Sequence, residues 1–355
     1  MKLIFQKNNL LKAVNIVLKA VPSKTTMPIL ECILIDASSN QIKFTSNDME
    51  LGIETIALDA KIFSEIIRKL PESDIVIETH DLKTTITCEK AKFDILGKSS
   101  EDFSYLPFVE KNDFISLSQF TLKEMIRQTI FSIAANENNK MMTGELFEIK
   151  DNMLRVVSLD GHRIAIRKMM LKETYEDRKI VVPGKTLIEI SKILSGEVED
   201  TVNLFFTSNH IVFEFDQTTV VSRLIEGEYF RIDQMLSSDY ETKVKINKKE
   251  LLSCIDRATL LVKESDKKPI IISINGNCME LKIDSQIGSM KEEIDIEKEG
   301  KDLMIGFNPK FLIDALRVID DETITIYLVN PKAPCFIRDE QESYIYLILP
   351  VNFIS

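Results

Sequence analysis

Few residues in this chain have the types and the spacing that catalysis requires. The most suggestive run is Asp160-Gly161-His162-Arg163, in which a carboxylate, an imidazole and a guanidinium follow one another closely. A general acid–base pair must face each other, however, and neighbours on a strand point to opposite faces. The other histidines are His80 and His210, and no G-x-S-x-G, Walker or glycine-rich dinucleotide motif is present. We therefore predict that the protein is not an enzyme and has no catalytic residues.

The cysteines give no sign of metal or redox chemistry. They stand far apart and form neither a C-x-x-C pair nor a His/Cys cluster, at positions Cys32, Cys88, Cys254, Cys278 and Cys335. We expect no metal, no cofactor and a reducing compartment. The first residues are too polar for a signal peptide, and no apolar run approaches the roughly 20 residues of a membrane span. The chain is therefore predicted to be cytoplasmic, with no membrane partner.

Positive charge is concentrated in particular segments of an acidic chain. Amphipathic segments at residues 6–20, 60–69, 120–134, 184–194, 248–263 and 309–319 carry a net charge of +10. The whole chain carries −11, so the remainder carries −21. Helices sharing one surface would make that surface positive. With no aromatic interleaving or helix-turn-helix, any DNA contact would be with the phosphate backbone, salt-sensitive and independent of base sequence.

The elements that position these charges repeat three times along the chain. An alternating strand leads into an amphipathic helix from Lys2, from Ile115 and again from Lys243. A second motif, a short apolar strand followed by a helix, carries lysines spaced 124 and 125 residues apart and an acid four residues after each, at Lys61/Glu65, Lys185/Glu189 and Lys310/Asp314. Each repeat predicts an α+β unit of two helices packed on antiparallel sheets.

The repeats place domain boundaries near residues 107–114 and 229–242, where the periodicity breaks. We predict three domains, at residues 1–112, 113–238 and 239–355. Three unrelated α+β domains would not share two motifs at near-constant spacing. The first repeat is short, because 13 residues separate Asp48 from Lys61 whereas 25 separate Asp160 from Lys185. A trimmed strand connection and an omitted loop after Glu54 both remain open.

Several motifs resemble the beta subunit of bacterial DNA polymerase III, the processivity clamp. The resemblance extends from Met1 to Pro350 and is carried by residues 25–37, 44–54, 154–166, 180–190, 305–316 and 346–351. It implies three clamp domains per chain and a head-to-tail homodimer, a closed ring with helices facing the hole and sheets outside. Duplex DNA would pass through the ring. The implied partners are the DNA polymerase III catalytic subunit, the clamp loader and other proteins with a clamp-binding motif.

The resemblance also implies three sets of site residues. A hydrophobic pocket for a partner peptide maps onto Met142, Leu159, Gly161, His162, Arg163, Ile164, Met235, Leu347, Leu349, Pro350 and Val351. DNA contacts in the family map onto Lys24 and the loop containing Lys140, and with the basic helix residues the DNA-facing set is Lys12, Lys19, Lys24, Arg68, Lys140, Lys192, Arg257 and Arg317. The subunit contact maps onto Phe103 and Leu106 of the first domain and Leu260 and Leu261 of the third.

Some features leave alternatives open. Leu347 and Leu349 also fit an ordinary core, and His162 an ordinary capped histidine. The pocket rim is uncertain at Phe230-Arg231-Ile232, and its C-terminal edge is uncertain because the chain ends VNFIS. A repeat scaffold that binds proteins without encircling DNA is the competing function. The net positive charge of all six helical segments favours the clamp, because a scaffold has no need of it.

Overall fold

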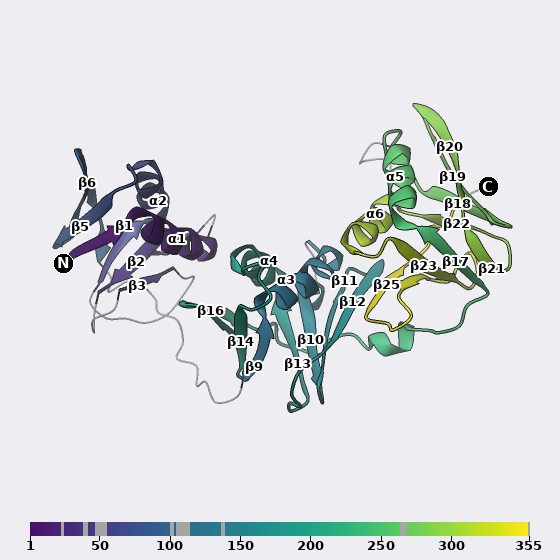
Figure 1. Ribbon diagram of the computed structural model, residues 1–355, viewed down its shortest axis with the longest axis horizontal. Helices are drawn as coiled ribbons and strands as arrows, with labels where there is room; N and C mark the ends of the chain where they lie inside the picture. The colour runs from purple at the N-terminus through teal and green to yellow at the C-terminus, as the bar shows by residue number, and fades with distance from the viewer. Residues whose placement is uncertain are drawn as a thin grey trace. The chain divides into compact units, whose positions relative to one another are not determined.

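The computed structural model describes residues 1–22, 25–37, 42–46, 55–99, 103, 114–135, 139–262 and 268–353. Residues Lys24 and Leu106, and the shortened stretch after Asp48, lie outside these ranges. The chain forms two compact units, Met1–Glu110 and Lys111–Ser355, which we call unit 1 and unit 2. Figure 1 shows the elements of each unit.

Unit 1 contains two helices packed on two antiparallel sheets. The first sheet has the order β1-β5-β6-β7, from β1 (Lys2–Gln6), β5 (Asp74–His80), β6 (Lys83–Cys88) and β7 (Ala91–Leu96). The second has the order β3-β2-β4-β8, from β3 (Lys43–Thr45), β2 (Cys32–Asp36), β4 (Thr55–Asp59) and β8 (Lys98–Ser99). Helices α1 (Lys7–Val17) and α2 (Ala60–Lys69) contribute Leu10, Val14, Phe63 and Ile67 to the core.

Unit 2 contains the second and third repeats. The second comprises β9 (Phe114–Ser118), α3 (Gln119–Arg127), β10 (Gly144–Lys150), β11 (Met153–Leu159), β12 (Arg163–Met170), β13 (Arg178–Pro183), α4 (Gly184–Ile193), β14 (Thr201–Phe206), β15 (His210–Phe215) and β16 (Thr218–Arg223). The third comprises β17 (Thr242–Asn247), α5 (Lys248–Thr259), β18 (Ile270–Asn275), β19 (Cys278–Ser285), β20 (Gly288–Asp295), β21 (Glu297–Gly300), β22 (Leu303–Phe307), α6 (Pro309–Val318), β23 (Thr323–Leu328), β24 (Cys335–Arg338) and β25 (Tyr344–Ile348).

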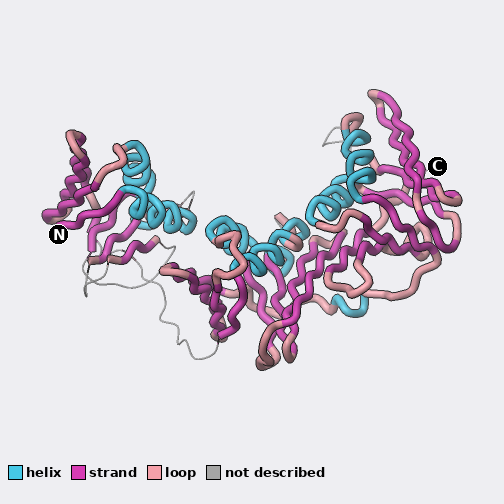
Figure 2. Tube along the Cα trace, viewed as in Figure 1, coloured by secondary structure: helices cyan, strands magenta, loops and turns pink. Residues whose placement is uncertain are grey.

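A nine-stranded sheet, β13-β10-β11-β12-β25-β24-β23-β17-β21, joins these two repeats. The connection is the antiparallel pair β12–β25, in which Ile164 lies opposite Leu347 and Ala165 opposite Tyr346. We call this contact the internal junction. The four helices of unit 2 lie on the same side of its sheets, the upper side in Figure 2.

The helices begin where the sequence predicted. Side chains of Asp59, Ser118 and Asn247 accept hydrogen bonds from backbone N–H groups in the first turns of α2, α3 and α5. The prediction for residues 120–134 was wrong at its end, because α3 stops at Arg127. Thr129 has a φ of −125°, outside the helical range, and a 3-10 turn follows at Ile130–Ser132.

Two sheet orders recur between repeats. The order β12-β11-β10-β13 of the second repeat recurs as β20-β19-β18-β22 in the third. The order β17-β23-β24-β25 of the third repeat recurs as β1-β5-β6-β7 in the first. Strands β20 and β7 are thus the counterparts of the two strands that meet at the internal junction. Among the described residues, no helix is long and apolar enough to cross a membrane.

Candidate partner groove, DNA-facing helices and subunit edges

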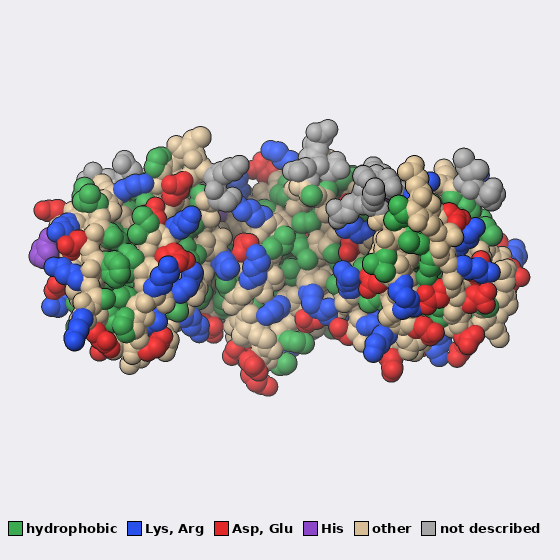
Figure 3. Space-filling model, turned by 90° about the horizontal axis from the view of Figure 1, so that it is seen from above, with side chains coloured by type: hydrophobic (Ala, Val, Ile, Leu, Met, Phe, Trp, Pro, Cys, Tyr) green, Lys and Arg blue, Asp and Glu red, His purple; other side chains and the backbone are tan. Residues whose placement is uncertain are grey.

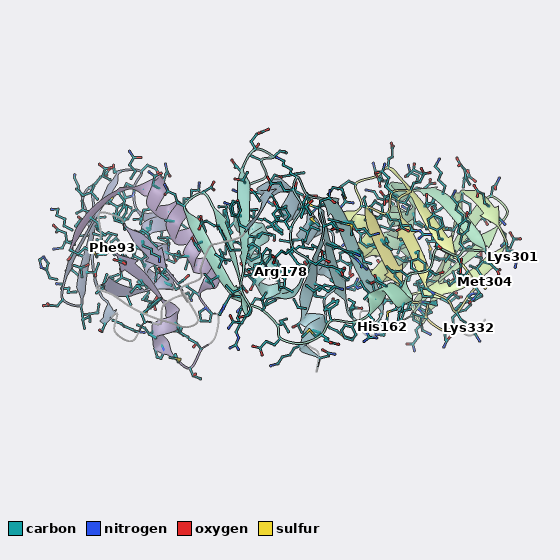
Figure 4. All side chains as sticks on the ribbon, turned by 90° about the horizontal axis from the view of Figure 1, so that it is seen from below. Phe93, His162, Arg178, Lys301, Met304 and Lys332 are labelled. Atoms are coloured by element: carbon teal, nitrogen blue, oxygen red, sulfur yellow. The ribbon has the colours of Figure 1, made fainter. Side chains whose placement is uncertain are left out.

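The Asp160–Arg163 segment is a turn, which corrects the expectation that it would be strand. The Asp160 carboxylate accepts hydrogen bonds from the backbone N–H groups of His162 and Arg163, at 3.0 and 3.1 Å. Gly161 has a φ of +82°, a conformation that glycine adopts without strain. The turn lifts His162 to the rim of unit 2 (Figure 4), where its ring stacks on Phe311 with centroids 5.8 Å apart.

Arg163 is enclosed between the second and third repeats. Its guanidinium donates to Asp160 at 2.9 Å, to Asp314 at 2.7 Å and to the Phe131 carbonyl at 2.6 Å. The rings of Phe131 and Phe311 lie against it, with centroids 5.3 and 4.6 Å from the guanidinium carbon. The family resemblance implied that Arg163 belongs to the pocket for a partner peptide. All three guanidinium nitrogens instead donate hydrogen bonds within the internal junction. Arg163 therefore holds the turn that carries His162 against the third repeat.

Several of the expected pocket residues form one apolar cluster on the nine-stranded sheet. Leu159, Ile164 and Leu347 are buried in it, and Met142 is partly buried against it. Other members of this cluster were not among the predicted pocket residues, including Met141, Tyr229, Ile232 and Phe336. Their shared position became visible only when β12 and β25 paired. These buried side chains lie beneath the exposed rim. Leu347 is buried, as its alternative assignment to an ordinary core predicted.

The exposed rim is made by other members of the expected set. Met235, Leu349 and Val351 are large apolar side chains on the surface, and Leu349 is 37% exposed. The Leu349 N–H donates to the His162 carbonyl at 2.9 Å, which ties the chain's end to the turn. Pro350 is partly buried beside it. The rim therefore combines His162 from the second repeat with the end of the third.

The two uncertain edges of this rim are defined by packing. Val351 donates its N–H to the Gly306 carbonyl at 2.8 Å, so the chain runs beside β22 from residue 351 to residue 353. A Cβ at Gly306 would lie 2.6 Å from the Phe353 ring, and only glycine leaves room for that ring. At the other edge, Phe230 packs edge-on against Tyr229, Ile232 is buried, and Asp233 pairs with Arg155 at 2.8 Å.

One ionisable group is buried close to this cluster without a partner. Glu145 of β10 is fully buried, and neither of its carboxyl oxygens has a hydrogen-bond partner among the described residues. Burial raises the pKa of Glu145 well above its ordinary value, because the charged form is poorly solvated there. Burial and the proximity of Glu145 also raise the pKa of Tyr229.

The basic residues expected to face DNA differ in how they are paired. Arg68, Lys192, Arg257 and Arg317 are exposed, and each contacts a carboxylate, in the pairs Arg68–Glu65, Lys192–Glu189, Arg257–Glu292 and Arg317–Asp256. Lys12 and Lys19 of the first repeat are exposed and form no ion pair within the described part of the chain. Lys140 is exposed in a 3-10 turn at Lys140–Thr143. Figure 3 looks onto the helix side of unit 2, where blue cations and red carboxylates intermingle.

The expected subunit contact needs one correction. Phe103 is 2% exposed and packs with Ile29, Leu34 and Ala57 in the core of unit 1, so it is unavailable to a second chain. Phe93 on the edge strand β7 is 40% exposed instead. In the third repeat Leu260 is 79% exposed, and Leu261 lies near Gly288 at the start of β20.

The described residues contain no group of His, Cys, Asp or Glu side chains placed to hold a metal ion. The five cysteine thiols form no disulfide. Burial raises the pKa of Cys335, and burial with Glu292 raises that of Cys254, in each case to about 12, so neither thiol is activated.

Comparison with known proteins decides the family. Models of the N-terminal, central and C-terminal domains of the DNA polymerase III beta subunit match residues 1–107, 116–230 and 233–352. The chain belongs to the DNA polymerase III beta subunit family. Its fold is accordingly that of three clamp domains, each with two helices packed on antiparallel sheets.

Named relatives agree over nearly the whole chain. The beta sliding clamp of Staphylococcus aureus is 33% identical, with 99% of each chain covered. The DNA polymerase sliding clamp of Bacillus subtilis is 33% identical with a TM-score of 0.95, covering all of both chains. A beta-subunit structure from Eubacterium rectale is 69% identical with a TM-score of 0.96, covering 99% of this chain and 100% of that one.

Proposed function

We propose that this protein is a DNA sliding clamp that closes as a head-to-tail dimer around duplex DNA. It tethers the replicative polymerase and other DNA-processing proteins to the template and performs no chemistry itself. Family membership supports the clamp function. The observation that supports the ring is the internal junction between β12 and β25. Strands β20 and β7 are the counterparts of these two strands, and each has one edge with no partner strand among the described residues. The three clamp domains are proposed to divide at residues 112/113 and 238/239, and the site of action is the cytoplasm.

The two unpaired edges correspond residue by residue to the junction strands. Strand β12 begins at Arg163 and β20 at Gly288, and both are eight residues long. Strand β25 begins at Tyr344 and β7 at Ala91. The internal register of Ala165 opposite Tyr346 thus becomes Met290 opposite Phe93 of a second copy. Exposed strand edges of this kind pair with another chain unless they are covered.

The side chains above this register also correspond. At the internal junction, Phe131 packs on Tyr346 with ring centroids 5.7 Å apart. The caps of α3 and α5, Ser118 and Asn247, align Phe131 with Leu260. The same packing therefore places the exposed Leu260 on Phe93 of a second copy. This replaces the expected contact of Phe103 with one that uses a surface side chain.

Charges at the two edges favour pairing of unlike strands. Strand β20 carries Glu292, Glu293 and Asp295 against Lys291, whereas in β7 the charges balance, with Lys92 and Asp94 on either side of Phe93. Two β20 edges would repel each other, and the balanced β7 edge does not repel a β20 edge in this way. A contact between unlike surfaces that closes after two copies is the head-to-tail ring.

DNA binding is assigned to the helix side and is not sequence-specific. Lys12 and Lys19 supply positive charge that is unpaired within the described residues, and the cations of unit 2 are already partly neutralised by neighbouring carboxylates. Such a surface neutralises few phosphates, so the contact is weak, and because it is electrostatic, added salt weakens it further. Weak backbone contact is what a protein that moves along DNA requires.

Partner proteins are assigned to the rim formed by His162, Met235, Leu349, Pro350 and Val351. A short apolar peptide that lies on this rim would reach Met142 and displace it from the cluster beneath. Methionine and leucine side chains suit such a surface because they adapt their packing to different ligands. The groove would serve the polymerase, the clamp loader and other clamp-binding proteins in turn.

Retention on DNA tests the sliding mechanism directly. Loaded protein is expected to stay on nicked circular DNA and to leave the same DNA after it is cut once, because a ring escapes only from an end. Gel filtration of the two complexes gives the retained fraction. Equal retention on both forms would contradict encirclement and favour a protein-binding scaffold. A Lys12→Ala/Lys19→Ala variant serves as the control. It should weaken loading without changing the difference in retention between circular and linear DNA.

A further inference from the structure

One residue of the partner rim, Met235, belongs to the segment that connects the second and third repeats. We call residues 229–241 the linker. Its 3-10 turn at Ile232–Met235 lies on the side of the nine-stranded sheet opposite the four helices of unit 2 (Figure 2). Met235 is exposed at the end of this turn, and no side chain caps the turn. A single uncapped turn has little stability of its own, so contacts with the sheet determine where Met235 lies.

Two arginines of the sheet contact the linker, one from each repeat. Arg155 of β11 pairs with Asp233 at 2.8 Å, and Arg338 of β24 donates to the Ser238 carbonyl at 3.3 Å. Both arginines lie on the face of the sheet that carries the apolar cluster, since each is two residues from a member of it. Their side chains are 9% and 11% exposed. The linker is therefore held by two buried cations, on either side of Met235 in the sequence.

The contact with the third repeat is reinforced by aromatic rings. Arg338 lies over the Tyr327 ring, with its guanidinium carbon 4.6 Å from the centroid, and pairs with Glu342 at 2.8 Å. Tyr240 of the linker packs edge-on against the same Tyr327 ring, with centroids 5.2 Å apart. The end of the linker is thus held by ring packing as well as by a hydrogen bond.

The contact with the second repeat depends on a cation whose hydrogen bonds are incomplete. The Nη1 of Arg155 contacts both Asp233 and Glu148, the latter at 3.1 Å. Its Nε and Nη2 are buried and have no acceptor among the described residues, and each such donor costs about 1–3 kcal/mol. Glu148 has a second partner in Lys179, at 2.6 Å. Arg155 therefore adds little to the stability of the sheet, and its contact beyond the sheet is with the linker.

The apolar contacts of the turn fix its depth but not its direction. Ile232 is buried in the cluster, and Leu236 packs partly buried against it. Hydrophobic burial has no preferred direction, whereas a charge-assisted hydrogen bond has. We propose that Arg155 is a positioning residue for the partner rim. Through Asp233 it fixes the orientation of the turn, so that Met235 faces a bound peptide.

This inference rests on the proposed function of the rim, and peptide binding tests it in the full-length protein. Arg155→Met should weaken binding of a fluorescein-labelled peptide rich in leucine and phenylalanine about fivefold, if Met235 then keeps the binding orientation about a fifth of the time. Fluorescence polarisation measures the affinity. Urea unfolding should be almost unchanged, because Glu148 keeps Lys179 and the mostly exposed Asp233 returns to water. A merely structural role would lower stability and affinity together.

Lys179→Met is the matched control. Lys179 pairs with the same Glu148 on the same face of the sheet, and its ion pair does not reach the linker. This variant should bind the peptide as the wild type does. Equal weakening by Lys179→Met and Arg155→Met would overturn the proposal, because it would show that the charge near Glu148, and not the contact with the linker, affects the peptide.

Variants of Asp233 test whether the two residues act through one contact. Asp233→Ala should weaken binding as much as Arg155→Met, and the double variant should bind no more weakly than either single variant. Asp233→Glu keeps the carboxylate and should restore most of the affinity. Losses that multiply in the double variant would contradict a shared role.

Hydrogen exchange separates this inference from the proposed function of the rim. The Leu236 N–H donates to the Asp233 carbonyl at 3.4 Å and should exchange several times faster in Arg155→Met, with the amides of β10 and β11 unchanged. If the wild type does not bind the peptide, the assignment of the rim fails and the exchange rate still decides the role of Arg155. Unchanged exchange at Leu236, or equal affinity of wild type and Arg155→Met, would overturn the inference.

Discussion

The internal junction and the proposed junction between copies are built from equivalent strands with different side chains. The internal pair β12–β25 buries Ile164, Ala165 and Tyr346. The corresponding edges β20 and β7 present Met290 and Phe93 among lysines and glutamates. An apolar junction with a buried arginine is part of the folded unit, whereas a smaller apolar contact with a charged border is typical of a surface that separates.

This difference has a consequence for how a ring opens. The third repeat cannot leave the second without exposing Arg163 and its partners Asp160 and Asp314. The edges β20 and β7 of separate copies can part and leave each chain intact. We therefore expect opening for DNA entry at the junction between copies.

Removing the central cation should damage only the internal junction. Arg163→Ala leaves Asp160 and Asp314 partly buried without their partner, which costs about 3–5 kcal/mol of unfolding free energy. Urea denaturation of the variant measures the loss. The control Arg178→Ala removes a more exposed arginine with a 3.8 Å ion pair and should cost less than about 1 kcal/mol. If the free energy of dimer dissociation fell by as much as the free energy of unfolding, the two junctions would not be independent.

A charge at the centre of the other junction should abolish the dimer and spare the fold. Phe93→Asp is expected to raise the dimer dissociation constant by about 100-fold or more, because an apolar anchor is replaced by a buried unpaired charge. Sedimentation at micromolar concentration measures it, and circular dichroism checks the fold. Phe120→Asp is a matched control on α3 with nearly the same exposure, 41% against 40%. A stable Phe93→Asp dimer would rule out the β20–β7 contact.

The partner rim should respond without either junction changing. Leu349→Asp is expected to weaken binding of an apolar clamp-binding peptide about tenfold to 100-fold, since the charge would be desolvated under the peptide. Fluorescence polarisation of a labelled peptide gives the affinity. Ile188→Asp, with the same 37% exposure on α4, should have no effect. If Leu349→Asp instead destabilised unit 2, the residue would belong to the core.

The smallest effect is a pH dependence within unit 2. The raised pKa of Glu145 means that its favourable contribution to stability is complete below the unfolded value of about 4.3 and is lost as the pH rises towards the folded value. Between the unfolded and the folded pKa, the free energy of unfolding of the wild type should fall by up to about 1.4 kcal/mol per pH unit relative to that of Glu145→Gln. Urea unfolding from pH 5 to 9 measures the difference. Parallel curves for the two proteins would show that Glu145 is not buried in its neutral form, and exposed Glu176→Gln provides the flat control.

The sequence by itself determined the repeat, the six helices and the family. Period-two and helical patterns are local, and capping residues such as Ser118 and Asn247 mark the helix starts without any distant contact. Motifs spanning the whole chain then identified the clamp fold. The sequence also showed that the helices carry the positive charge. It could not show that Arg257 and Arg317 are paired with Glu292 and Asp256, because those pairs join separate elements.

Only the tertiary structure decided which side chains are available to a partner. Phe93 and Phe103 are alike in the sequence, yet one lies on an edge strand and the other in the core of unit 1. Arg163 seemed a peptide ligand and is instead surrounded by Asp160, Asp314 and Phe131. Burial depends on what packs from distant parts of the chain, and strand pairing brings Tyr346 beside Ala165 across 181 positions. Local sequence patterns do not reveal that pairing. Only the fold therefore shows which residues at the two junctions are buried and which are exposed.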